Sequence, residues 1–366
     1  MDQEIFHRAK RYSAIKYSFA LFDIAYILFL LPLFLKTGLS KTLASNIAKF
    51  LVFPLTVPAY ILIASLGYYI LDFPFSIYRS FLLEHKFSLS TQKITDWLKD
   101  QCKQFSIAYI ISLILVAAFY FILGRFPKIW WLIVSLFWIF FSLILARLTP
   151  VIIIPLFFKY KKLSDETLRM RILNLAQKMR VKILDCFEID FSKKTLKANA
   201  AFVGVGKTKR VILADTLKDK YTHDEIEVIL AHEFAHYKLK HLIKLILINS
   251  LITVVSFYLI FKTSSYTLRF FGFASLSEIA ALPVILIYFT LFGVITQPIE
   301  AYLSRRLERN ADKMALETTG LKDAFISMME KLAAQNLADR TPHPIIKFFF
   351  FDHPPIDERI AFAKST

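Results

Sequence analysis

Six long apolar stretches most constrain what this 366-residue chain can fold into. A helix needs about 20 mostly apolar residues to cross a bilayer. Stretches of this kind lie near Tyr17–Leu35, Leu51–Leu71, Ile107–Leu123, Trp130–Phe158, Leu245–Phe261 and Ile279–Thr296. Hydrophobic residues make up 56% of the chain, above the roughly 45–50% of soluble domains. The sequence therefore predicts an all-α polytopic membrane protein and argues against a soluble enzyme, a disordered chain or a fibrous repeat.

The net charge of +17 fits this interpretation. Membrane proteins collect Lys and Arg in their cytosolic loops. Nine such residues lie in the N-terminal segment and the 72–106 loop, against seven in the loops of the opposite face. This bias favours a cytosolic location for both termini and for the large loop 159–244. No stretch interleaves aromatic and basic residues on a soluble face, so we expect no nucleic-acid partner.

Two polar blocks, at about 159–244 and 298–366, lie outside the predicted bilayer. The first opens with a helix start at Ser164–Glu166. Short strands are predicted after it at Val181–Leu184 and Cys186–Ile189. Two more, at Ala200–Val203 and Arg210–Leu213, flank the turn Gly204-Val205-Gly206. In the membrane region, Pro150 and Pro155 should break the fourth apolar stretch near its end.

The spacing of two histidines and a glutamate carries the chemistry. Thr222 and Glu225 have the spacing of a capping box, and the helix that they open contains His232-Glu233-Phe234-Ala235-His236. Two imidazoles at i and i+4 lie on one helix face and can bind one Zn²⁺, with Glu233 as the general base toward water. Two cysteines are too few for a Cys-based zinc site or a disulfide framework.

A catalytic zinc site needs a third protein ligand, and the candidate is Glu308. His236 lies about nine residues before the fifth apolar stretch, or roughly 13 Å along a helix, and Glu308 about twelve residues after the sixth, or roughly 18 Å. The fifth stretch leaves one face of the membrane and the sixth returns to it. His236 and Glu308 should therefore lie on the same side, at comparable distances from the membrane. Asp312, one turn after Glu308, can accept the free N–H of a ligating histidine.

Five sequence blocks resemble the integral-membrane zinc metalloproteases known as CAAX prenyl proteases of the a-factor-converting type, in peptidase family M48. These blocks are Asn199–Gly204, Arg210–Leu217, Ala231–His236, Ser304–Asp312 and His353-Pro354-Pro355 with Arg359. The resemblance implies a zincin-like metalloprotease domain with a small β-sheet, divided along the chain into 1–158, 159–244, 245–297 and 298–366. The first and third segments hold about four and two membrane helices, and the others carry the catalytic residues.

The resemblance also implies roles for single residues. His232, His236 and Glu308 correspond to the ligands of one Zn²⁺ per chain, and Glu233 to the base. Asn199 and the adjoining Ala200 are implied to hold the substrate backbone at a strand edge. His353 is implied to stabilise the oxyanion. Arg359 is a candidate to contact substrate or to pair with a carboxylate in the site.

The implied substrate is a lipidated or membrane-associated peptide. Two alternatives stay open: a quality-control protease of the heat-shock M48 branch, and a transporter or scaffold with an inert zinc site. The family usually has seven membrane helices, and the first has no counterpart here. That difference, and the lack of a C-terminal retrieval signal, favour a bacterial inner membrane over the endoplasmic reticulum. His241 is predicted to lie at the membrane boundary on another helix face than His236. The oligomeric state is left open.

Overall fold

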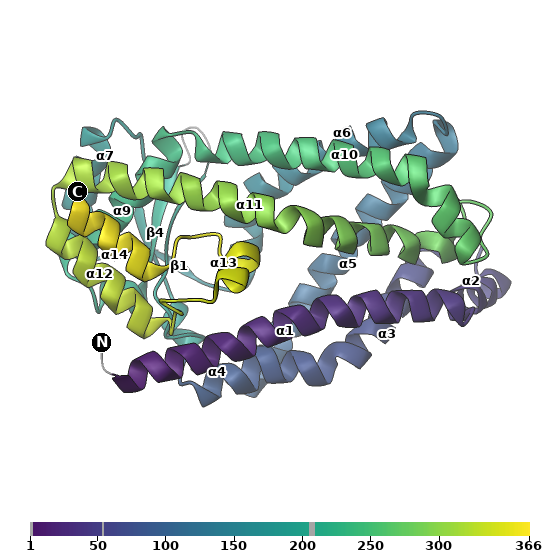
Figure 1. Cartoon of the computed structure of the whole chain (residues 1–366), viewed down its shortest axis with the longest axis horizontal. Coiled ribbons are helices and arrows are strands. Elements are labelled where there is room, and N and C mark those ends of the chain that lie inside the picture. Colours follow the sequence, from purple (N-terminus) through teal and green to yellow (C-terminus); the bar gives the residue numbers. More distant parts are fainter. Residues whose placement is uncertain (1–2, 53–54, 205–208) are drawn as a thin grey trace.

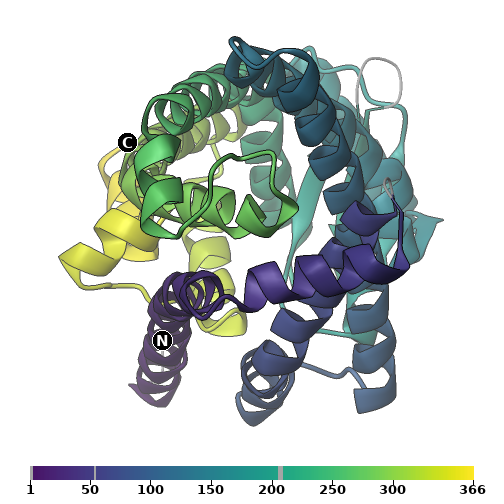
Figure 2. The ribbon, with the colours of Figure 1, turned by 90° about the vertical axis from the view of Figure 1, so that its right-hand side faces the viewer.

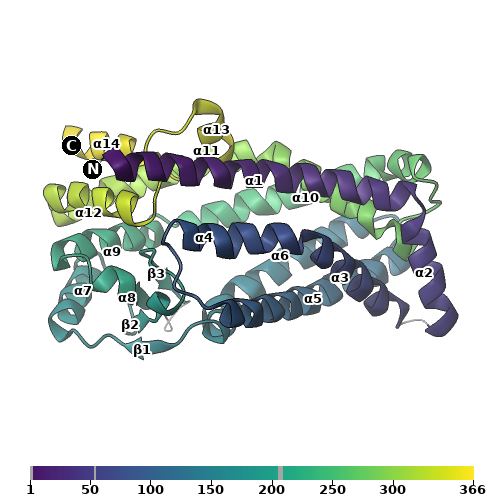
Figure 3. The ribbon, with the colours of Figure 1, turned by 90° about the horizontal axis from the view of Figure 1, so that it is seen from below.

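Long helices run side by side and carry a small sheet and a group of short helices at one end (Figure 1). The computed structural model describes residues 3–52, 55–204 and 209–366. Within these residues, six helices are long and apolar enough to span a bilayer, which agrees with the sequence prediction. Both chain termini lie at the same end as the sheet, as an even number of crossings requires (Figures 1 and 3).

Most of the long helices extend beyond the apolar stretches that predict them, whereas α6 ends before its stretch does. The N-terminal half contains α1 (Gln3–Lys36), α2 (Leu39–Phe50), α3 (Thr56–Ile77), α4 (Leu83–Lys86), α5 (Ile94–Arg125) and α6 (Trp130–Leu148). The C-terminal half contains α7 (Glu166–Lys178), α8 (Asp215–Lys218), α9 (His223–Lys238), α10 (His241–Phe270), α11 (Leu282–Thr319), α12 (Lys322–Gln335), α13 (Pro344–Phe350) and α14 (Ile356–Ser365). Seen along the long axis, the long helices stand around the rim of the molecule (Figure 2).

The predicted break in the fourth apolar stretch is confirmed. The α-helix α6 ends at Leu148 and continues as a π-helical turn, η2 (Thr149–Ile153), and a 3₁₀ turn, η3 (Ile154–Leu156). Pro150 and Pro155 lack the N–H that an α-helix needs at these positions, so the regular hydrogen-bond ladder cannot continue.

In the described part of the chain, four strands form one sheet in the order β1-β2-β4-β3. The strands are β1 (Tyr160–Lys162), β2 (Cys186–Ile189), β3 (Ala200–Val203) and β4 (Arg210–Ala214). β4 pairs with β2 in parallel and with β3 antiparallel, with Ala200 opposite Leu213. The predicted turn at Gly204-Val205-Gly206 lies partly outside the described residues.

The predicted strand at Val181–Leu184 is wrong. Arg180, two residues after the end of α7, adopts the left-handed region at φ 54°, and the next residues run without regular structure into β2. Both sides of β2 are occupied by other strands, because β1 pairs with it antiparallel and β4 in parallel. Val181 is buried in the core, so its apolar character reflects packing beneath the sheet.

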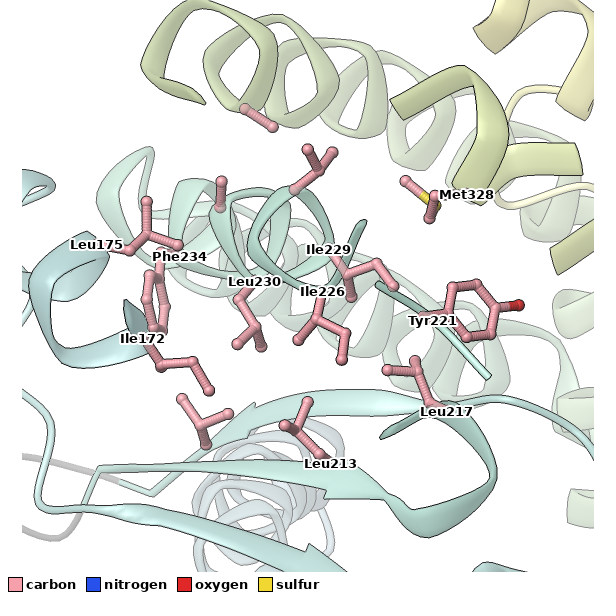
Figure 4. Close-up of a cluster of buried hydrophobic side chains, with 14 of the residues drawn as sticks. Ile172, Leu175, Leu213, Leu217, Tyr221, Ile226, Ile229, Leu230, Phe234 and Met328 are labelled. Carbon is pink, nitrogen blue, oxygen red and sulfur yellow. The ribbon is translucent and has the colours of Figure 1, made fainter. Parts of the chain in front are cut away.

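The metal-motif helix α9 lies at the centre of a hydrophobic core that joins both polar blocks. Figure 4 shows side chains of α9, among them Ile226, Leu230 and Phe234, between the sheet and the helices above it. The core combines residues from 159–244 with Ala311, Ala315, Phe325, Met328 and Ile360 from the C-terminal block. The boundaries that the sequence places at 244/245 and 297/298 fall inside the continuous helices α10 and α11.

The start of α9 is fixed by the predicted capping box. The Thr222 side chain accepts a hydrogen bond from the backbone N–H of Glu225, and the Glu225 carboxylate accepts one from the N–H of Thr222. Glu225 is buried and also accepts bonds from Ser327 and Lys331 of α12, at 2.7 Å each. The cap therefore fixes the first turn of α9 and also joins α9 to α12.

Removal of this cap should destabilise the fold measurably. We expect Thr222→Ala to cost about 1 kcal/mol, because the orphan N–H of Glu225 loses its acceptor. The measurement is the midpoint of thermal unfolding of the detergent-solubilised protein. Thr167→Ala, an exposed threonine in the first turn of α7, is the matched control and should change stability by less than about 0.5 kcal/mol. Equal midpoints for the two variants would contradict the prediction.

Candidate active site

Two helices bring the predicted metal ligands together. On α9, His232 and His236 share a face with the small residues Ala231 and Ala235, which are fully buried. On α11, the buried residues Ala311 and Ala315 follow Glu308 by three and seven positions, so they lie on the same helix face. Alanines at the contact let the two helix axes approach closely. Nε2 of His232 lies 3.1 Å from Oε2 of Glu308, and Nε2 of His236 lies 3.2 Å from its Oε1.

Asp312 and Arg359 form a layer of support behind His232. Oδ1 of Asp312 lies 2.8 Å from Nδ1 of His232, which orients the ring so that its Nε2 faces Glu308. The Arg359 guanidinium binds Asp312 through two nitrogens, at 2.8 and 2.5 Å. Asp312 is 1% exposed and Arg359 12% exposed. The sequence suggested two roles for Arg359, contact with substrate or pairing with a carboxylate of the site. In the structure Arg359 pairs with the Asp312 carboxylate.

The predicted placement of His241 on another helix face than His236 is wrong, because the two rings are neighbours. It is fully buried, and its Nδ1 lies 3.0 Å from Nδ1 of His236. A spacing of five residues would separate the rings on a continuous helix, but α9 ends at Lys238 and Lys240 adopts the left-handed region at φ 56°. This break starts α10 in a new direction and returns His241 toward α9. The only sequence signal was the histidine itself beside three lysines.

His353 reaches the site from the segment between α13 and α14. Its Nε2 lies 3.4 Å from Oε2 of Glu308, and its Nδ1 lies 2.8 Å from Oδ1 of Asp352. Asp352, which the sequence analysis did not single out, fixes the ring orientation and leaves Nε2 facing the metal ligands. The side chain of His353 is half-exposed, so it is accessible to a substrate.

The donor set fits a metal ion. His232 Nε2, His236 Nε2 and a carboxylate oxygen of Glu308 all lie within 4.8 Å of one another. The two Nε2 atoms are 3.0 Å apart, and Glu308 is buried beside them at 5% exposure. Three converging lone-pair donors need a shared cation, and two histidines with one carboxylate form a known catalytic zinc set.

The charges around the motif also favour a cation. Burial lowers the pKa of His232, but hydrogen bonds to Asp312 and Glu308 outweigh this effect and raise the pKa to about 9. The cage thus stabilises positive charge between its ligands. Burial raises the pKa of Glu233, and the neighbouring imidazoles act in the opposite direction. A raised carboxylate pKa suits a group that takes a proton from water and returns it later.

Asn199 and Ala200 lie at the start of β3, which is an edge strand. Asn199 is exposed, and its carbonyl accepts a bond from the N–H of Ala214. Farther along the same strand, the Phe202 ring contacts Phe234 and Tyr237 of α9, with centroids 5.2 and 5.6 Å apart. Strand β3 therefore runs beside the helix that carries the metal motif, and among the described strands only β4 pairs with it.

Two family models together match almost the whole chain. A model described as peptidase family M48 matches residues 162–366, more than half of the sequence. The chain belongs to peptidase family M48. A second model, described as the CAAX prenyl protease N-terminal region with five membrane helices, matches residues 1–159.

Individual relatives match this chain over nearly its full length. The chain is 30% identical to an uncharacterized metalloprotease of Bacillus subtilis, YhfN, over 97% of this chain and 84% of the relative. It is 29% identical to CAAX prenyl protease 1 of Saccharomyces cerevisiae, over 98% and 86%. The crystal structure of Saccharomyces mikatae Ste24p superposes with a TM-score of 0.89 at 25% identity, over 99% of this chain and 90% of that one.

These matches select among the alternatives that the sequence left open. The protein is a multi-pass membrane metalloendopeptidase of the CAAX prenyl protease type, which acts on peptide substrates and requires a metal. The match of residues 1–159 to the CAAX-type membrane region disfavours the heat-shock branch. The family match also disfavours an inert transporter or scaffold.

Two substitutions should separate metal binding from catalysis. We expect Glu308→Ala to lose the metal, since two histidines alone hold it poorly, whereas Glu233→Gln keeps about one ion per chain. Glu233→Gln should nevertheless lower kcat by about 10²–10⁴-fold, because an amide cannot accept the proton. Metal content by plasma mass spectrometry and peptide cleavage are measured on the same preparations. Full metal retention by Glu308→Ala would remove Glu308 from the ligand set.

His241 provides a third test of the site. His241→Phe keeps an aromatic ring at this position but removes the nitrogen beside His236 Nδ1, so we expect metal affinity to fall about 10- to 100-fold. Competition with a chelator measures the affinity. His7→Phe, an exposed histidine on α1, is the matched control and should bind metal like the wild type. If both variants bind metal equally well, His241 has no part in orienting His236.

Proposed function

We propose that the protein is a membrane-embedded zinc metalloendopeptidase that cleaves lipidated or membrane-associated peptides. His232, His236 and Glu308 hold the ion. The observation that carries this proposal is the convergence of their donor atoms within 4.8 Å, on helices from two distant parts of the chain, with Glu233 next to the first ligand. When bound, Zn²⁺ supplies Lewis-acid activation of water and of the scissile carbonyl.

The protein's own groups then handle protons and charge. The Glu233 carboxylate accepts a proton from the attacking water and delivers it to the leaving amine. Nε2 of His353 donates a hydrogen bond to the oxyanion, and Asp352 holds the ring in place from Nδ1. The Asp312 carboxylate lies against Nδ1 of His232 and favours the tautomer that carries its proton there, which leaves Nε2 free to bind the ion.

The substrate backbone is bound along β3. An extended peptide can add to an exposed sheet edge through main-chain hydrogen bonds, and Asn199 and Ala200 begin that edge. This placement directs the peptide past α9, because Phe202 of the same strand packs on Phe234. Pairing through the backbone tolerates varied side chains, so selectivity for the substrate depends on its delivery from the membrane.

The named relatives support a lipidated substrate. The yeast relative is named CAAX prenyl protease 1, and the Arabidopsis thaliana and Homo sapiens relatives are named its homologues, whereas the Bacillus subtilis relative is named an uncharacterized metalloprotease. We place the active site on the cytosolic face of the membrane, on the basis of the Lys and Arg distribution. We place the chain in a bacterial inner membrane, and the 30% identity to a Bacillus subtilis relative supports this choice. A membrane-associated peptide is then the general substrate class, and a prenyl group is one form of the lipid.

A paired cleavage assay tests this proposal. Purified protein is incubated with a farnesylated peptide and with the same peptide lacking the lipid, each with and without a chelator. We expect the farnesylated peptide to be cleaved at the higher kcat/KM, because the lipid places it at the bilayer where the site lies. The chelator should abolish cleavage and added Zn²⁺ should restore it.

Each arm of this assay can contradict one part of the proposal. Cleavage that persists at full rate with the chelator would rule out the metal mechanism. Equal kcat/KM for both peptides would leave the protease but remove the preference for lipidated substrates. Restoration by another divalent cation but not by Zn²⁺ would reassign the ion.

A further inference from the structure

Arg305 joins the helix that carries Glu308 to the segment that carries His353. Its guanidinium donates hydrogen bonds to the carbonyl of Lys347 at 3.0 Å and to the carbonyl of Phe351 at 2.5 Å. Both carbonyls belong to the C-terminal end of α13, where Phe351 is the cap residue and His353 follows two positions later. The Lys347 carbonyl also accepts a long bond of 3.4 Å from the backbone N–H of Phe351. Arg305 therefore adds a shorter, charged donor at this helix end, where a cationic side chain is favourable.

Further ion pairs fix the same segment against α11. The Lys347 ammonium contacts the Glu358 carboxylate, and Arg309 binds the same carboxylate at 3.2 Å. Glu358 belongs to α14, so α11 contacts both helices that flank His353. These outer pairs are more exposed than the Arg305 contacts, and exposed pairs contribute little individually.

The position of Arg305 on α11 is what couples the two parts of the site. Arg305 lies three residues before Glu308, and side chains at that spacing share a helix face. A single rigid helix thus sets both the carboxylate ligand and the donor that holds the end of α13. Nε2 of His353 lies 3.4 Å from Oε2 of Glu308, so a small shift of the Phe351–His353 segment would move the imidazole off the site.

We propose that Arg305 is a positioning residue for the hydrolysis, which holds His353 at the distance from the metal ligands where it can stabilise the oxyanion. This inference rests on the proposed function, because it requires His353 to act in the reaction. Both bonds come from Nη1 of the planar guanidinium, which holds its two N–H groups at a fixed angle toward the two carbonyls. The adjacent Arg306 is exposed on the same helix and provides a matched comparison.

The test uses the full-length protein in detergent with a peptide that the wild type cleaves. Arg305→Met, Arg305→Lys, Arg306→Met, His353→Ala and the double variant Arg305→Met/His353→Ala are compared for metal content, thermal midpoint, kcat and KM. We expect Arg305→Met to keep the metal and KM but to lower kcat by about 10- to 100-fold, part of the effect of losing an oxyanion donor. Arg305→Lys should recover part of kcat, and Arg306→Met should match the wild type.

The double variant separates positioning from general structural support. If Arg305 acts through His353, adding Arg305→Met to His353→Ala should leave kcat within about twofold of His353→Ala alone, since coupled residues are not additive. Two independent, multiplying losses would overturn the proposal, and so would a normal kcat in Arg305→Met. If Arg305→Met loses the metal or does not fold, Arg305→Lys decides: reduced kcat at unchanged KM supports the proposal, and wild-type kcat contradicts it.

Failure of this inference differs from failure of the proposed function. A wild-type protein that cleaves no peptide with Zn²⁺ bound would contradict the protease itself. A wild-type protein that cleaves, with Arg305→Met and Arg306→Met behaving alike, would contradict only the role of Arg305. An effect of Arg305→Met in a protein where His353→Ala has none would show that Arg305 does not act through His353.

Discussion

The buried carboxylate of Glu308 between two imidazoles is the interaction on which the rest of the structure depends. Burying a charge is costly unless it is paired, and its partners here come from α9, a different part of the chain. The contact can form only if α10 leaves the catalytic end of the molecule and α11 returns to it. The membrane topology is therefore a requirement of the site, and the long helices set the height at which its ligands meet.

Charge balance explains why the supporting residues take the form that they do. Glu308 and Asp312 place two carboxylates one turn apart on α11, and Arg359 neutralises one of them through a bidentate pair. The remaining negative charge faces the histidines, which favours a cation between the ligands. His232 is oriented by a carboxylate, whereas His236 contacts the imidazole ring of His241. The two ligating imidazoles therefore have different neighbours, and the partner of His236 adds no carboxylate to the cage.

The sequence predicted those features that depend on one local pattern or on topological parity. The membrane helices follow from apolar length, the start of α9 from its capping box, and the meeting of Glu308 with the histidines from the two intervening crossings. Features that depend on a change of chain direction were not predictable. His241 reaches His236 only because Lys240 breaks the helix at positive φ, and Val181–Leu184 resembles a strand only because it is apolar. The bonds of Arg305 depend on where α13 ends, about forty residues later.

The continuity of α11 has a consequence for how the enzyme responds to its membrane. Leu282 lies at the far end of this helix and Asp312 near its catalytic end, so tilt or displacement of the membrane portion is transmitted to Glu308 without a hinge. Pro298 is the point where such a helix would bend, yet it is buried and the helix continues through it. Packing around Pro298 therefore limits bending between the bilayer and the metal ligands. In a bilayer of different thickness, helix tilt adjusts at modest energetic cost, and here the adjustment would reach the two α11 residues that fix the metal cage.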